Sequence, residues 1–123
     1  MDNQDDMNRG IASSLDALGI DRLLLWVWWH DEGQFEGEPR DFTDPRYLLP
    51  ALEAWRKKDP YTRRWRIESA ESGIESPDGI TPERKDYGTA ALIGDHLYMC
   101  DDLDRDPIAW AAECFADALG VGA

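Results

Sequence analysis

Apolar residues recur at helical spacing in two segments, one near each end of the chain. The first segment lies within residues 8–20. The predicted helix in it ends at Gly19, a residue type that commonly follows a helix. The second covers residues 106–120, where Asp106 and then Pro107 stand in the order typical of a helix start. The apolar stripes consist of Ile11, Leu15 and Leu18 in the first segment and of Ile108, Ala111, Ala112, Phe115 and Leu119 in the second. We predict a helix in each segment.

A nearly continuous apolar run, "RLLLWVWWHD", occupies residues 22–31. Its aromatic content favours a strand, and apolar residues on both faces favour a central strand that is covered on both sides. In that arrangement Trp26 and Trp29 belong to the core. The later stretch "RRWRIES" alternates instead, which predicts a strand with Trp65 and Ile67 inward and its other face exposed.

Two segments lack any apolar period and are rich in glycine, proline and charge. We therefore predict long loops at residues 31–43 and 71–87. The stretch "TAALIGDHLYMCD" that follows predicts a hairpin with Gly94–Asp95 as its two-residue turn.

The middle of the chain predicts one short helix. Pro50 has no backbone N–H and interrupts a helix, so we expect a turn at 44–48 and a helix at 50–58 with Leu52 and Trp55 inward. The predicted order is α-β-α-β-β-β-α. It indicates a single α+β domain over residues 1–123, with about four mainly antiparallel strands and two to three helices packed on them.

The charge of the chain is strongly negative and unevenly distributed. Thirteen Lys and Arg against 26 Asp and Glu give a net charge of −13, although residues 40–66 carry a local excess of basic side chains. Such a surface repels phosphates, so we expect no direct binding to nucleic acid. It favours a basic protein partner, and the alternative is that the acidity serves only solubility or a salty cytoplasm.

The sequence also bears on location and covalent chemistry. No apolar run is long enough to span a membrane, and the polar N-terminus is unlike a secretory signal, so we expect a cytoplasmic protein. Cys100 and Cys114 do not form a disulfide framework and are expected to pack as small apolar residues. The sequence does not predict the oligomeric state.

Two groups of residues suggest chemistry. His30, Asp31 and Glu32 end the tryptophan-rich strand, and with His96 they could form the site of a small enzyme. Asp102, Asp104, Asp106 and Glu113 have the spacing of calcium-loop ligands. Pro107, however, occupies the position where such a loop needs glycine, so we expect no metal site there and no cofactor elsewhere.

These observations favour a non-enzymatic, acidic binding module. We expect an inhibitor or antagonist that occupies a basic surface of a nucleic-acid-handling protein or a toxin, as anti-defence and immunity proteins do. The alternatives are the small enzyme and an acidic subunit of a larger assembly. The expected partner-binding residues are the acidic Asp101, Asp102 and Asp104, the loop aromatics Phe35 and Phe42, and the basic Arg63, Arg64 and Arg66. For the two phenylalanines, the alternative is that their rings fold back over the core.

Overall fold

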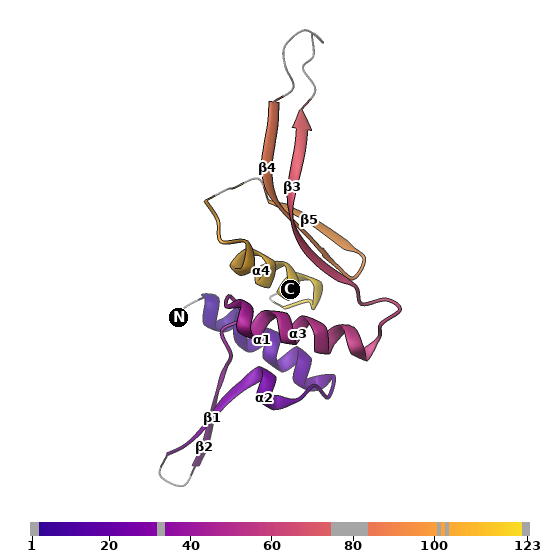
Figure 1. Ribbon diagram of the computed structural model, residues 1–123. Coiled ribbons are helices and arrows are strands. Elements are labelled where there is room, and N and C mark those ends of the chain that lie inside the picture. Colours follow the sequence, from indigo (N-terminus) through magenta and orange to yellow (C-terminus); the bar gives the residue numbers. More distant parts are fainter. Residues whose placement is uncertain (1–2, 32–33, 75–83, 101, 103, 122–123) are drawn as a thin grey trace.

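The computed structural model describes residues 3–31, 34–74, 84–100, 102 and 104–121 (Figure 1). These residues form four helices and five strands. The helices are α1 (Asn3–Ala17), α2 (Arg22–Leu25), α3 (Pro45–Lys58) and α4 (Pro107–Ala118). The strands are β1 (Trp26–Asp31), β2 (Gln34–Pro39), β3 (Trp65–Ile74), β4 (Arg84–Ile93) and β5 (His96–Cys100).

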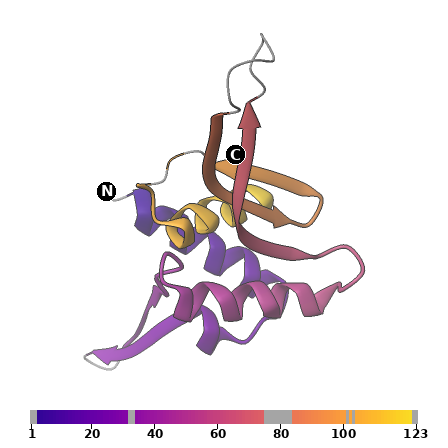
Figure 2. The same ribbon diagram turned by 45° about the horizontal axis from the view of Figure 1, so that its top comes forward.

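The strands form two antiparallel sheets. β1 pairs with β2 in a hairpin that runs from Trp26 opposite Pro39 to Asp31 opposite Gln34. β3, β4 and β5 form a second sheet in that order. Helices α1, α3 and α4 lie between the two sheets (Figures 1 and 2). The α+β class and the antiparallel pairing are confirmed. The predicted sheet of about four strands fits only loosely, because the five strands form one sheet of two and one of three.

Part of each predicted loop is strand. β2 lies inside the predicted loop 31–43, and β3 and β4 extend into the predicted loop 71–87 as far as Ile74 and Arg84. Glycine and proline disfavour strands, but they are tolerated at sheet edges and strand ends. Both strands of the β1–β2 hairpin are edges, so Gly37 and Pro39 can stand in β2.

The tryptophan-rich segment is not a central strand covered on both faces. Its leucines form α2, and β1 pairs with β2 alone among the described strands. Val27 is 39% exposed because a two-stranded sheet leaves part of its surface open. Trp26 is half-buried and packs against the core. The prediction that it is a core residue is therefore partly confirmed. The side chain of Trp29 lies outside the described residues.

Helix α3 is longer than predicted, because it begins at Pro45 and continues through Pro50. Asp44 caps it by accepting a hydrogen bond from the backbone N of Arg46. Pro50 removes one backbone hydrogen bond, but the helix still buries an apolar face on both sides of it. That face consists of Leu48, Ala51, Leu52 and Trp55.

The core lies where the three long helices meet the second sheet. Its fully buried side chains include Ile11 and Leu15 of α1, Leu52 of α3 and Phe115 of α4. The inward positions predicted for α1, α3 and α4 are thus confirmed. Trp65 and Ile67 also pack against the core, as predicted, while the alternate residues Arg64, Arg66 and Glu68 are exposed. The turn predicted between β4 and β5 is confirmed, with Gly94 at φ 62°.

Candidate functional site

Of the two phenylalanines predicted to bind a partner, only Phe42 has a side chain among the described residues. Phe42 is fully buried, so its ring belongs to the core and not to a partner surface. The alternative that this ring folds back over the core is therefore the correct one. The side chain of Phe35 lies outside the described residues, and its role stays a prediction.

The loop that carries Phe42 is held by a buried asparagine of α1. Asn8 is only 6% exposed, and its Oδ1 accepts a hydrogen bond of 3.1 Å from the backbone N of Phe42. Its Nδ2 lies 3.4 Å from Oδ1 of Asp41. The side chain thus satisfies a backbone donor that the protein interior separates from water.

Replacing Asn8 with alanine is expected to lower the free energy of unfolding by about 1–3 kcal/mol, because the buried N–H of Phe42 loses its acceptor. Urea unfolding of the purified variant measures this loss. The matched control is Ser13→Ala, a change of an exposed residue on the same helix. Equal stability of the two variants would contradict the role assigned to Asn8.

The three long helices, α1, α3 and α4, begin on the same side of the molecule (Figure 1). A cavity of about 170 Å³ lies at this point. It is lined by Gln4 and Met7 from α1, by Thr43 from the residues before α3, and by Arg105, Ala109 and Glu113 from α4 and the residues before it. The cavity thus brings together the first turn of α1 and the start of α4, about a hundred positions apart in sequence, and acidic residues lie next to both in the sequence.

We define the acidic surface as five exposed aspartates that are close in sequence to residues lining this cavity: Asp5, Asp6, Asp102, Asp104 and Asp106. Two arginines belong to the same region, and each has a carboxylate partner. Arg9 lies 3.9 Å from Asp5, and Arg105 pairs with Glu113. The remaining carboxylates therefore give the surface an excess of negative charge. Asp102 and Asp104 were predicted as contact residues, whereas Asp101 lies outside the described residues.

Asp5 and Asp6 are the members that the sequence analysis missed. They belong to α1, which begins five residues earlier than predicted, at Asn3. One signal for the longer helix was available, because Met7 stands one turn before Ile11 and packs against the same core.

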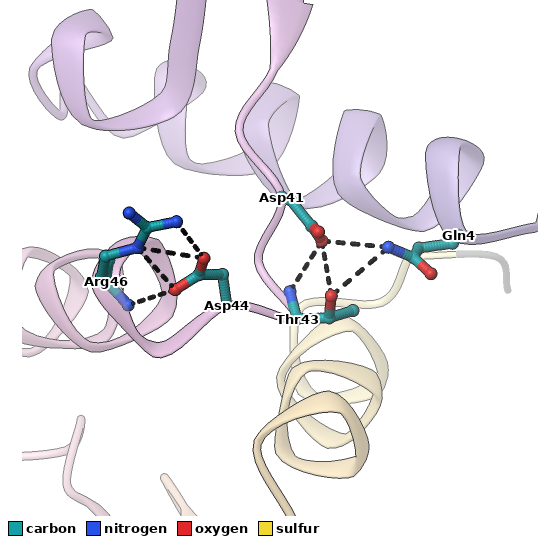
Figure 3. A network of polar contacts seen from close by, with 5 residues as sticks. All are labelled: Gln4, Asp41, Thr43, Asp44 and Arg46. Atoms are coloured by element: carbon teal, nitrogen blue, oxygen red, sulfur yellow. Dashed lines mark hydrogen bonds and ion pairs between the residues drawn. The ribbon is translucent and has the colours of Figure 1, made fainter. Parts of the chain in front are cut away.

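A hydrogen-bond network fixes the residues between β2 and α3 beside the cavity (Figure 3). Oδ1 of Asp41 accepts bonds from Gln4 Nε2 at 3.0 Å, from Thr43 N at 3.1 Å and from Thr43 Oγ1 at 2.6 Å. Partial burial raises the pKa of Asp41, but these hydrogen bonds outweigh it and hold the pKa below its usual 3.8. Next to it, hydrogen bonds from Arg46 lower the pKa of Asp44.

The Asp41 network is expected to lose its stabilising effect in acid. Because the pKa of Asp41 is lower in the folded chain than its usual value, its contribution is complete above pH 3.8 and disappears as the pH falls through the folded pKa. Asp41→Asn should therefore be less stable than the wild type at neutral pH, and this difference should shrink as the pH falls through the folded pKa of Asp41. Urea titrations over this range measure the difference. A difference that stays constant with pH would contradict the assignment.

The arginines predicted as contacts lie elsewhere, on or before β3. Arg63 contacts its own chain, with its guanidinium carbon 5.6 Å from the centre of the Trp55 ring and Nη1 donating to Trp55 O at 3.5 Å. Arg66 pairs with Glu68 at 3.5 Å, and Arg64 is exposed. These residues form a surface separate from the acidic one.

The described residues do not show a site formed by the residues suggested for an enzyme. Glu32 and the side chains of His30 and Asp31 lie outside the described part of the chain. His96 is exposed on β5, where its ring stands 6.0 Å from that of Tyr98. Burial raises the pKa of the Cys114 thiol to about 12, which opposes formation of a nucleophilic thiolate.

The residues with calcium-loop spacing have other partners. Asp106 caps α4 by accepting a hydrogen bond from Ile108 N at 3.0 Å, and Pro107 is the first residue of the helix, as predicted. Glu113 pairs with Arg105. Within the described residues, no three His, Cys, Asp or Glu side chains are placed to share a metal ion.

Comparison of the chain with models of protein families, with curated proteins and with solved structures finds no match. No helix formed by the described residues is long and apolar enough to cross a membrane.

Proposed function

We propose that the protein is a cytoplasmic, non-enzymatic binding module whose acidic surface occupies a basic surface of another protein. The observation that carries this proposal is the meeting of the first turn of α1 and the start of α4 beside one cavity. Each stretch brings carboxylates, and the two arginines of the region are already paired with carboxylates of their own chain. A partner's basic side chains would therefore meet an unbalanced negative charge.

The partner we propose is a nucleic-acid-handling protein or a toxin, which the bound module inhibits. Proteins that bind nucleic acid carry lysine and arginine surfaces that neutralise phosphates. An array of carboxylates can compete for the same side chains. The net charge of −13 adds a long-range attraction that speeds encounter with such a surface.

The proposal is tested by affinity capture from extracts of the host cell with matched variants as bait. Asp102→Asn/Asp104→Asn neutralises two carboxylates of the acidic surface, and Glu68→Gln/Asp95→Asn neutralises two exposed carboxylates on β3 and in the β4–β5 turn. Each pair removes two negative charges, so both change the net charge from −13 to −11. We expect the control variant to retain a basic protein that the first variant loses. Equal capture by both variants would reject the acidic surface as the contact.

A further inference from the structure

A second cavity lies away from the acidic surface, between α2, the end of β2 and the first half of α3. It measures about 190 Å³ and is lined by Leu23, Leu24, Arg40, Arg46, Tyr47 and Pro50. In Figure 1, α2 lies on the opposite side of the helices from the second sheet. The cavity thus combines two guanidinium groups with an aromatic ring and aliphatic side chains, on a chain that is otherwise strongly acidic.

Arg40 is fixed in place by α2. Its backbone N donates to Leu25 O at 2.8 Å, and its Nη2 donates to Leu23 O at 3.2 Å. Both acceptors belong to a four-residue helix whose last carbonyls have no partner within the helix itself. The guanidinium carbon lies 5.1 Å from the centre of the Tyr47 ring, within the range of a cation–π contact. Arg40 therefore needs little reorganisation to receive an anion.

The guanidinium of Arg40 is incompletely satisfied by the described residues. Its Nε is buried and has no hydrogen-bond partner there, and Nη2 uses one donor at Leu23 O. A guanidinium has five N–H donors, so those left on the two Nη atoms are available to an anion. Burial of Nε keeps water from part of the cation, which strengthens the attraction between the cation and an anion placed beside it.

The second arginine contributes less charge than the first. Arg46 is largely occupied by Asp44, which accepts hydrogen bonds from Arg46 Nε at 3.1 Å and from Nη2 at 2.7 Å. The cavity therefore offers close to one net positive charge, from Arg40, within a chain of charge −13. This balance fits an anion with a single charge better than a doubly charged phosphate.

The other walls of the cavity are apolar. Leu23 is 68% exposed although Leu25, two residues later, is fully buried, and Tyr47 and Pro50 line the same cavity. A cavity of this size has room for a group of about six carbons, since about 150 Å³ suffices for benzene. Burial of such a group against Leu23 would remove apolar surface from water on both partners.

We propose that this cavity binds a small carboxylic acid that carries one apolar group. The carboxylate pairs with the guanidinium of Arg40, and the apolar group packs against Leu23, Tyr47 and Pro50. This site and its ligand are independent of the acidic surface and of the proposed protein partner.

Isothermal titration calorimetry with phenylacetate tests the proposal. We expect saturable binding of phenylacetate, and much weaker binding of the neutral phenylacetamide and of inorganic phosphate. Arg40→Gln should weaken phenylacetate binding about tenfold or more, because it removes a charge-assisted hydrogen bond. The matched control is Arg56→Gln, on the same helix as Tyr47 and paired with Glu53, which should leave the affinity unchanged.

Arg40→Gln also removes a bond to α2, so a second variant keeps the test decisive if that protein unfolds. Leu23→Ser changes an exposed side chain that is not part of the core. It should weaken binding of phenylacetate without changing the weak binding of acetate, which lacks the apolar group. The proposal is overturned if phenylacetate does not bind, if phenylacetamide or phosphate binds equally well, or if Leu23→Ser weakens acetate and phenylacetate alike.

Discussion

Phe42→Ala is expected to lower the free energy of unfolding by about 3–5 kcal/mol, the usual cost of removing a large side chain from a core. Phe42 is one of the largest fully buried side chains among the described residues. Its truncation removes apolar contacts and leaves a void, because the loop cannot collapse freely while Asn8 holds its backbone. Urea unfolding measures the effect. The slope of the free energy of unfolding against urea concentration should stay unchanged, which shows that only stability differs.

The matched control is Tyr61→Ala, because Tyr61 is also a loop aromatic but is 93% exposed. This variant should unfold within about 0.5 kcal/mol of the wild type, as surface substitutions usually do. If Phe42→Ala were equally mild and instead impaired binding to a partner, Phe42 would be a contact residue and not a core residue.

The parts of the fold that could be predicted depend on residues close together in sequence. α4 follows from Asp106, Pro107 and an apolar stripe, and the β4–β5 turn follows from Gly94 and Asp95. Each of these signals acts through bonds or contacts within a few residues. They were therefore visible without knowledge of the rest of the fold.

The parts that could not be predicted depend on distant partners. β2 has weak strand propensity, and it is a strand because β1 pairs with it along its length. An apolar run such as residues 22–31 does not reveal whether helices, a sheet or solvent will cover its faces. The sequence around Phe42 likewise does not distinguish it from an exposed loop aromatic, because its burial depends on the distant Asn8 and on the core.

Some features of the candidate site could likewise be predicted from the sequence, and others could not. The excess of negative charge and the exposure of Asp102 and Asp104 followed from composition and from their place before a helix. The participation of Asp5 and Asp6 did not, because it requires α1 and α4 to lie side by side. In the sequence Arg40 is one of many basic residues, because its contacts with α2 and Tyr47 exist only in the folded chain.

Neutralising two carboxylates of the acidic surface with Asp102→Asn/Asp104→Asn is expected to slow association with a basic partner about three- to tenfold at low salt. Neither substitution removes a core contact, and Asp106 keeps its role as the cap of α4. The stability of the variant should therefore be close to that of the wild type. Stopped-flow or surface-binding kinetics with the captured partner measure the association and dissociation rates separately.

The salt dependence separates a contact surface from general acidity. Exposed charges are screened over about 10 Å at 0.1 M salt, so the advantage of the wild type should shrink as salt is added. Glu68→Gln/Asp95→Asn carries the same net charge of −11 but keeps the acidic surface. It should therefore associate nearly as fast as the wild type and with nearly the same salt slope. If both variants slowed equally, the effect would arise from net charge alone, and the exposed Arg64 and its neighbours on β3 would be the next surface to test.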